Sequence, residues 1–108
     1  MEYKKIVAII RKGYLEKVES ELQELGVKGI TVTCVKGFGE YTNYFSRNWM
    51  CEHTRIELFV NPDEVDSIVG SILKSAHTGA SGDGMVAVLP AEAVYRIRTK
   101  RLATIDEV

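Results

Sequence analysis

The sequence predicts an α+β fold in which two amphipathic helices cover one face of an antiparallel β-sheet. Apolar residues recur at helical spacing in residues 14–25 and again in 65–76. Runs of β-branched and apolar residues come before, between and after these segments, beginning with Ile6–Ile10 and ending with Met85–Leu89. Two strand patterns follow one another between the helices, which favours antiparallel pairing.

Composition predicts one globular domain, 1–108, of 108 residues with 45% hydrophobic and 27% charged residues. The net charge of -1 gives no basic surface of the kind that binds nucleic acid, so we expect no nucleic-acid partner. Cys34 and Cys51 are too few for a disulfide framework and fit a reducing, cytoplasmic location. The run Ile6–Ile10 is too short for a signal-peptide core or a membrane span.

The first helix is predicted over 14–25, because Leu15, Val18 and Leu22 lie three or four residues apart among charged residues. Gly26 should end this helix. A strand follows at 29–38, where good strand residues continue without a break until Gly37.

The segment 40–54 has no clean period of either kind and is predicted to be irregular. The third strand is predicted at 55–60. Asn61 and Pro62 then predict a helix start, at which the Asn61 side chain accepts a backbone N–H and Glu64 reaches back as in a capping box.

Three glycines in Thr78–Gly84 leave the backbone free to take positive φ, and successive N–H groups in such a turn can form an anion site. The alternative is a simple connector between helix and strand. Pro90 should end the last main strand, and a short strand is expected at 94–99. Strand alternation there would place Arg96 and Arg98 on one face, where guanidinium groups bind phosphate well. The tail, 100–108, is expected to be mobile.

The resulting β-α-β-β-α-β order is the ferredoxin-like plan, with both helices on one side of the sheet. The strand Ile6–Ile10 has apolar residues on both of its faces, and the helices cover only one face of the sheet. We therefore expect another subunit to cover the second face, which predicts an oligomer.

Three motifs in this order resemble the PII signalling proteins, from residue 4 to about residue 99. They are Val35–Gly39, the turn with Thr78-Gly79 and Gly82-Asp83-Gly84, and Arg96–Thr99. The resemblance implies a homotrimer of ferredoxin-like subunits, with adenine nucleotides bound between neighbours and no further cofactor. It also implies a regulator, not an enzyme, that docks on a membrane transporter or a metabolic enzyme.

Carried over to this sequence, the resemblance implies three groups of nucleotide-binding residues. Backbone N–H groups would hold the phosphates, arginines of the neighbouring subunit would bind them too, and the remaining residues would line the cleft. The first group is Gly82, Asp83 and Gly84, and the second is Arg96 and Arg98. The third is Gly37, Phe38 and Gly39 near the ribose and the base, with Gly29, Ile30 and Thr31 contributing from across the subunit interface.

Four positions depart from the family pattern. Met85 replaces a lysine, Glu40 an arginine, Tyr41 a glutamine, and His53 a lysine. Each lost group would bind the terminal phosphate, magnesium or 2-oxoglutarate in the family. We therefore expect ADP or AMP to be favoured, with ATP as a further ligand and a lost response to 2-oxoglutarate.

The segment 40–54 is shorter than the usual loop of the family and carries Tyr41, Tyr44, Phe45 and Trp49. Large aromatic groups favour a partner-docking surface. The alternative is that they fold back onto the trimer. We predict no metal site at Cys51-Glu52-His53, because three adjacent ligands suit tetrahedral geometry poorly.

Family precedent predicts nitrogen regulation, and the altered loop leaves regulation of inorganic carbon or bicarbonate transport as an alternative. A slow nucleotide hydrolase is an alternative of another class. Asp83 would then be the acidic candidate, although no obvious base lies beside it in sequence. A trimer for heavy-metal tolerance would share the fold but not the glycine turn and the arginine pair.

Overall fold

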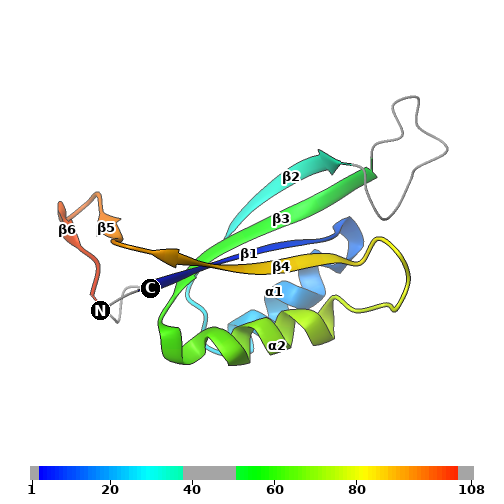
Figure 1. Cartoon of the computed structure of the whole chain (residues 1–108), viewed down its shortest axis with the longest axis horizontal. Coiled ribbons are helices and arrows are strands. Elements are labelled where there is room, and N and C mark those ends of the chain that lie inside the picture. Colours follow the sequence, from blue (N-terminus) through cyan, green and yellow to red (C-terminus); the bar gives the residue numbers. More distant parts are fainter. Residues whose placement is uncertain (1–2, 38–50, 105–108) are drawn as a thin grey trace.

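The computed structural model describes residues 3–37 and 51–104. The predicted β-α-β-β-α-β order is confirmed, with a small hairpin added at its end (Figure 1). The elements are β1 (Tyr3–Arg11), α1 (Leu15–Glu24), β2 (Thr31–Gly37), β3 (Cys51–Val60), α2 (Val65–Ser75), β4 (Gly84–Ala91), β5 (Tyr95–Arg96) and β6 (Arg101–Leu102), with single 3-10 turns at Lys12–Tyr14 and Pro62–Glu64.

The four main strands form one antiparallel sheet in the order β2-β3-β1-β4. Both helices lie against the same face of this sheet (Figure 1). This is the predicted ferredoxin-like arrangement. The order leaves β2 and β4 as edge strands, and it leaves the second face of the sheet without a layer of its own among the described residues.

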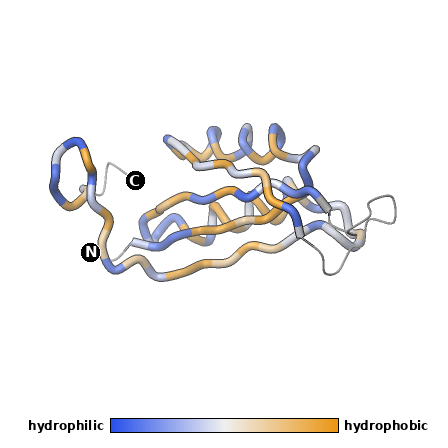
Figure 2. Tube along the Cα trace, turned by 90° about the horizontal axis from the view of Figure 1, so that it is seen from above, coloured by the Kyte–Doolittle hydropathy of each residue, from blue (hydrophilic) through white to orange (hydrophobic). Residues whose placement is uncertain are grey.

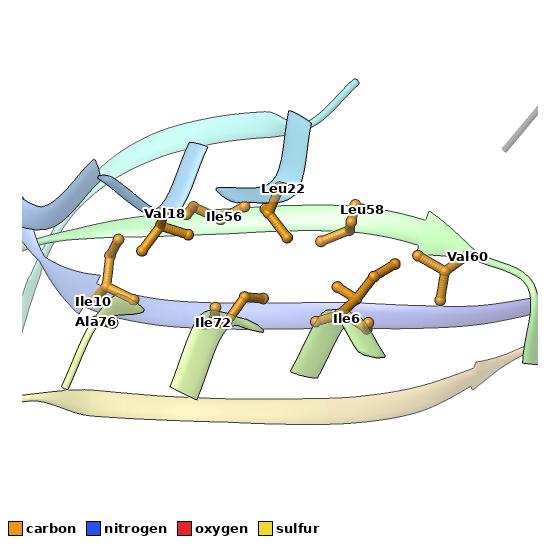
Figure 3. Close-up of a cluster of buried hydrophobic side chains, with 11 residues drawn as sticks. Ile6, Ile10, Val18, Leu22, Ile56, Leu58, Val60, Ile72 and Ala76 are labelled. Carbon is orange, nitrogen blue, oxygen red and sulfur yellow. The ribbon is translucent and has the colours of Figure 1, made fainter. Parts of the chain in front are cut away.

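The core lies between the sheet and the helices (Figure 3). Alternate residues of β1 and β3 point toward the helices, and each helix contributes the apolar stripe that its spacing predicts. The buried residues of this cluster are Ile6, Ala8, Ile10, Val18, Leu22, Ile56, Leu58, Val60, Ile68, Ile72 and Ala76. Burying one such large side chain stabilises the fold by about 1.5–3 kcal/mol.

Gly26 ends α1 as predicted. Its φ of 88° is the left-handed conformation that glycine adopts without strain. The Gly26 N–H donates to the Gln23 carbonyl at 3.0 Å, and the Val27 N–H donates to the Leu22 carbonyl at 3.1 Å. These two bonds form a Schellman motif, which satisfies the last carbonyls of the helix.

The start of α2 differs in detail from the predicted capping box. The Asn61 side-chain nitrogen donates to the Glu64 carboxylate at 2.9 Å, and the Glu64 N–H donates to the Asn61 backbone carbonyl at 3.0 Å. The two residues are paired as expected, but the Asn61 side chain makes no cap bond to the backbone. A single 3-10 turn at Pro62–Glu64 brings Glu64 close enough for this pairing.

The prediction that the irregular segment extends to Thr54 is wrong, because Cys51 already belongs to β3. His53 pairs with Arg11 of β1 on one side and with Val35 of β2 on the other. The local sequence shows only a weak strand pattern. Pairing with a strand on each side nevertheless holds this segment in the sheet. Residues 40–50 of that segment lie outside the described residues.

The predicted break at Pro90 is also wrong. β4 continues to Ala91, and Pro90 pairs with Lys4 of β1. Proline has no backbone N–H to donate. Because β4 is an edge strand, no neighbouring strand on its outer side requires that donor.

The predicted strand at 94–99 is shorter than expected. β5 ends at Arg96, and residues 97–100 form a turn that is closed by the Lys100 N–H and the Arg96 carbonyl at 2.8 Å. Lys100 has a φ of 59°, so the chain reverses here. Arg98 therefore lies in the turn, and the prediction that it shares a strand face with Arg96 is wrong.

The first residues of the segment 100–108, which was expected to be mobile, belong to the fold. Arg101 and Leu102 pair with β5, and the Tyr3 hydroxyl donates to the Ala103 carbonyl at 2.6 Å. Both Tyr3 and Ala103 are buried. Residues 105–108 lie outside the described residues. Within residues 3–37 and 51–104, no helix combines the length and the apolar character needed to cross a membrane.

Candidate functional site

The glycine turn between α2 and β4 is built around the carboxylate of Asp83. One carboxylate oxygen accepts the backbone N–H groups of Thr78 and Gly79, each at 2.9 Å. The other accepts the Thr78 hydroxyl and the Nε–H of Arg11, the latter at 3.0 Å. Gly79 and Gly82 take φ angles of 89° and 97°, which allow the backbone to wrap around this side chain.

These bonds fix the charge of the carboxyl group. Hydrogen bonds from the Thr78 side chain and the Thr78 backbone, followed by those from Gly79 and Arg11, hold the pKa of Asp83 well below its usual range. Asp83 is therefore ionised at physiological pH. The turn carries a negative charge on its inner side, and two of its backbone donors are already used by that charge.

Two side chains from the sheet tie the turn to the ends of β1 and β3. Arg11 donates from Nη2 to the Ser81 carbonyl at 2.6 Å, in addition to its contact with Asp83. The Nε2 atom of His53 lies 3.1 Å from the Gly82 carbonyl oxygen, so this nitrogen donates the hydrogen bond. The turn is thus held at the end of the sheet where β2 ends and β3 begins.

Gly84 has a structural reason of its own to be glycine. A Cβ atom built at this position would lie 1.7 Å from the Ile9 carbonyl oxygen, and the φ angle is 100°. The close approach of β4 to β1 therefore requires glycine here, whether or not a ligand binds.

A second group of predicted residues lines a groove of about 480 Å³ at the other end of the sheet. Gly29, Ile30 and Thr31 form one side of it, and the chain just before and within β5 contributes another side. The floor is apolar and comes from the end of β3 and from α2. The remaining lining residues that matter here are Leu58, Phe59, Val60, Ile68, Tyr95 and Arg96.

The predicted site residues therefore fall into two sets within one chain. Gly37 pairs with Cys51 at the turn end, whereas Thr31 pairs with Glu57, six residues further along β3. At about 3.3 Å per residue the two sets are separated by about 20 Å along the sheet. Figure 1 shows the glycine turn and the β5–β6 hairpin beyond opposite ends of the strands.

Gly82, Asp83 and Gly84 belong to the set at the turn end with Gly37. Arg96 and Arg98 belong to the hairpin end, near Gly29–Thr31. Phe38 and Gly39 lie outside the described residues, as do the predicted docking residues Tyr41, Tyr44, Phe45 and Trp49.

The sequence did not predict that Arg11 and Thr78 would bind the Asp83 carboxylate and so hold this turn. The Thr78 hydroxyl also accepts the Ala80 N–H at 3.1 Å, an ST turn of the kind that a threonine before a glycine-rich turn can signal. Arg11 is separated from Asp83 by 72 residues, and no local pattern predicts their contact. Within the described part of the chain, no group of three or more His, Cys, Asp or Glu residues is arranged to hold a metal ion.

Comparison with known proteins identifies the family. A family profile described as "Nitrogen regulatory protein P-II" matches residues 3–101. The chain belongs to the P-II family. P-II proteins are nitrogen regulatory signalling proteins, and the resemblance predicted from the glycine turn and the arginine motif is confirmed.

Individual P-II relatives agree with this assignment. Nitrogen regulatory protein P-II 2 of Methanothermobacter thermautotrophicus is 42% identical over 103 residues, covering 89% of this chain and 90% of that protein. The P-II homolog of Arabidopsis thaliana is 34% identical over 106 residues, covering 91% of this chain but 54% of that protein. The chain thus spans about half the length of this plant relative.

A solved P-II structure supports the fold. The crystal structure of Arabidopsis thaliana PII bound to citrate has a TM-score of 0.83 and 34% sequence identity to this chain. The match covers 94% of this chain and 89% of that chain. The ferredoxin-like α+β fold is therefore shared with a P-II protein over nearly the whole length.

Proposed function

We propose that this P-II protein binds an adenine nucleotide in a cleft between subunits of a homotrimer, and that nucleotide occupancy controls a transporter or a metabolic enzyme in nitrogen regulation. We place this action in the cytoplasm. The observation that carries the proposal is the separation of the predicted nucleotide residues into two sets at opposite ends of one sheet. A nucleotide spanning a glycine turn and an arginine hairpin needs the turn of one subunit and the hairpin of another.

The exposed face of the sheet supports a multi-subunit assembly. Val7 and Ile9 lie on this face, opposite the core residues Ile6 and Ile10. Met85 pairs with Ile9 and is 67% exposed. Apolar side chains exposed on this scale mark a surface that another chain covers.

Charged residues on the same face give that association a fixed register. Glu57 accepts Arg55 at 2.6 Å and lies 3.7 Å from the Lys5 nitrogen. The Lys5 nitrogen also lies 5.9 Å from the centre of the Phe59 ring. Such pairs contribute little to stability when exposed, but they disfavour alternative docking arrangements once covered.

The groove at the hairpin end suits the base of a nucleotide. It has an apolar floor formed by Leu58, Val60 and Ile68, and the backbone of Gly29–Thr31 forms its edge. Concave apolar sites with a few backbone donors and acceptors are typical of small-molecule pockets, and a purine base has the matching apolar faces and polar edges. Arg96 lines the same groove and supplies positive charge for a phosphate.

The turn end favours a short phosphate chain. Arg11 is bound to Asp83 and Ser81, and the N–H groups of Thr78 and Gly79 are bound to Asp83. Met85, next to Gly84, brings no charge. With these groups committed or neutral, the third phosphate of ATP would gain little, and we expect ADP or AMP to bind better.

The same bonds support a binding role over catalysis. The Asp83 carboxylate accepts hydrogen bonds from Thr78, Gly79 and Arg11. A carboxylate whose pKa is held well below its usual range is a poor general base, because it has little affinity for the proton that it would have to accept. The solved Arabidopsis thaliana PII structure is bound to citrate, which supports ligand binding as the role proposed for this chain.

Calorimetric titration of the full chain with AMP, ADP and ATP, each with and without magnesium, tests the proposal. We expect ADP or AMP to bind more tightly than ATP with magnesium, without a response to 2-oxoglutarate. Added bicarbonate separates the carbon alternative from the nitrogen one. Absence of binding by all three nucleotides would overturn the proposal, and tenfold tighter binding of ATP would overturn the preference for a shorter ligand.

A matched pair of variants distinguishes the site from a general charge effect. The variant R96A/R98A should lose at least about tenfold in ADP affinity, because it loses two charge-assisted contacts. The variant K17A/K74A removes the same charge from exposed positions on the helices and should bind as the unmodified chain does. Equal losses in the two variants would contradict a localised site.

A further inference from the structure

The β5–β6 hairpin concentrates positive charge in a way that the two expected arginines do not explain. Arg96, Arg98, Lys100 and Arg101 are four cations within six residues, and all four are exposed. In Figure 2 this hairpin forms a mostly hydrophilic loop beyond the end of the sheet.

Two of these cations directly oppose each other. Arg96 of β5 pairs with Arg101 of β6, so both side chains leave the ribbon on the same side. Like charges in directly opposed positions destabilise a two-stranded ribbon. An anion lying between the two guanidinium groups would remove that repulsion.

The hairpin is nevertheless a defined structure. The Ala103 N–H donates to the Val94 carbonyl at 2.7 Å, and the buried Tyr3 hydroxyl holds the Ala103 carbonyl from β1. Lys100 adopts a φ of 59°, a conformation that lysine takes less readily than glycine or asparagine. The backbone thus presents the four charges from a fixed turn.

The glycine turn, at the opposite end of the sheet, lacks available positive charge. The glycine turn carries the ionised Asp83, the guanidinium of Arg11 is bound within the turn, and the side chain after Gly84 is the neutral Met85. A phosphate chain seated at this turn therefore needs its positive charge from another source.

We infer that Lys100 and Arg101 act with Arg96 and Arg98 as a four-cation clamp on the phosphates of a nucleoside diphosphate bound at the glycine turn of a neighbouring subunit. This inference rests on the proposed function, in which the two ends meet across a subunit boundary. It assigns Lys100 and Arg101 as residues that recognise the second phosphate and so favour a diphosphate over a monophosphate.

The test compares three ligands that differ only in phosphate content. Adenosine, AMP and ADP are titrated into the full chain and into K100A/R101A at one ionic strength. ADP affinity should fall about tenfold in the variant, AMP affinity by less than about threefold, and adenosine affinity should be unchanged. The salt dependence of ADP binding should also weaken, because fewer charges are screened.

Two further variants separate the position of the charges from their number. K100R/R101K keeps both charges and should retain the ADP preference, whereas K17A/K74A removes equal charge elsewhere and should bind ADP normally. Thermal unfolding should show K100A/R101A to be no less stable than the unmodified chain, since it relieves the repulsion between Arg96 and Arg101.

The possible failures can be told apart. If the unmodified chain binds no adenine nucleotide, the proposed function fails and the inference fails with it. If it binds ADP and K100A/R101A binds ADP equally well, the inference alone is overturned. An equal loss of adenosine, AMP and ADP affinity in K100A/R101A would also overturn it, because the residues would then support the fold of the groove and not the phosphates.

Discussion

The guanidinium of Arg11 lies 3.0 Å from the carboxylate of Asp83, although the two residues are 72 positions apart in the sequence. This ion pair joins the end of β1 to the glycine turn before β4. It places the turn beside the point where residues 38–50 leave the sheet. Arg11 and His53, whose Nε2 atom lies 3.1 Å from the Gly82 carbonyl oxygen, therefore hold the turn against the end of β1 and the start of β3.

Asp83 should make the stability of the protein sensitive to acid. Its pKa in the folded protein lies below the value of about 3.9 expected in the unfolded chain. The contribution of Asp83 is therefore fully present above that value and is lost as the pH falls below it. Thermal unfolding measured from pH 7 to pH 2.5 should show a larger acid loss for the unmodified chain than for Asp83→Asn.

The control for this measurement is Asp63→Asn, which removes an exposed carboxylate from the 3-10 turn before α2, away from the glycine turn. It should keep the acid response of the unmodified chain. If Asp83→Asn and the unmodified chain lose stability in parallel, the carboxylate does not organise the turn as described.

Gly84→Ala should be strongly destabilising. The new Cβ would lie 1.7 Å from the Ile9 carbonyl oxygen and the residue would keep a φ of 100°, so β4 must move away from β1. We expect a loss of about 3 kcal/mol or more in the free energy of unfolding, measured by denaturant titration.

Gly70→Ala is the matched control for that change. Gly70 is exposed within α2, and an added Cβ would meet nothing within 4 Å. Alanine has the higher helix propensity, so this variant should gain about 0.5–1 kcal/mol. Losses of similar size at both positions would contradict the close approach of β4 to β1.

Tyr3→Phe should loosen the β5–β6 hairpin while leaving the core filled. It removes only the hydroxyl that donates to the Ala103 carbonyl at 2.6 Å. We expect a loss of about 1 kcal/mol in the free energy of unfolding and faster amide exchange in residues 94–103. ADP affinity should fall with it if the hairpin binds phosphate. Unchanged exchange there would show that the hairpin does not depend on this anchor.

The parts of the fold that could be predicted are those that local sequence determines. The spacing of Val18 and Leu22 indicates the buried face of α1, and Gly26 indicates its end, because both depend on residues within a few positions. The β5–β6 hairpin was missed because the strand pattern of 94–99 continues through the turn, whose reversal depends on the conformation of Lys100.

Contacts between distant segments account for most of the rest. His53 lies in a strand because Arg11 and Val35 pair with it from both sides, although its own neighbours show no strand pattern. The glycine turn was predicted as an anion site from its glycines alone. Its internal carboxylate contact with Arg11 depends on the tertiary structure, and it changes how much charge the turn can offer to a ligand.

In the proposed trimer each nucleotide site takes its turn from one subunit and its hairpin from another. Two defective variants test it when they are combined. Ser81→Glu places a negative charge on an exposed residue of the glycine turn, and R96A/R98A removes charge from the hairpin. Each variant alone should bind ADP poorly.

The decisive measurement is the ADP-binding capacity of a mixture of the two variants, unfolded together and refolded in equal amounts. If the sites are shared between subunits, random assembly gives about a quarter of the sites an intact turn and an intact hairpin, so ADP binding should return to about that level. If each site lies within one chain, every site keeps one defect and the mixture should bind no more ADP than the separate variants. That result would contradict a nucleotide site shared between subunits.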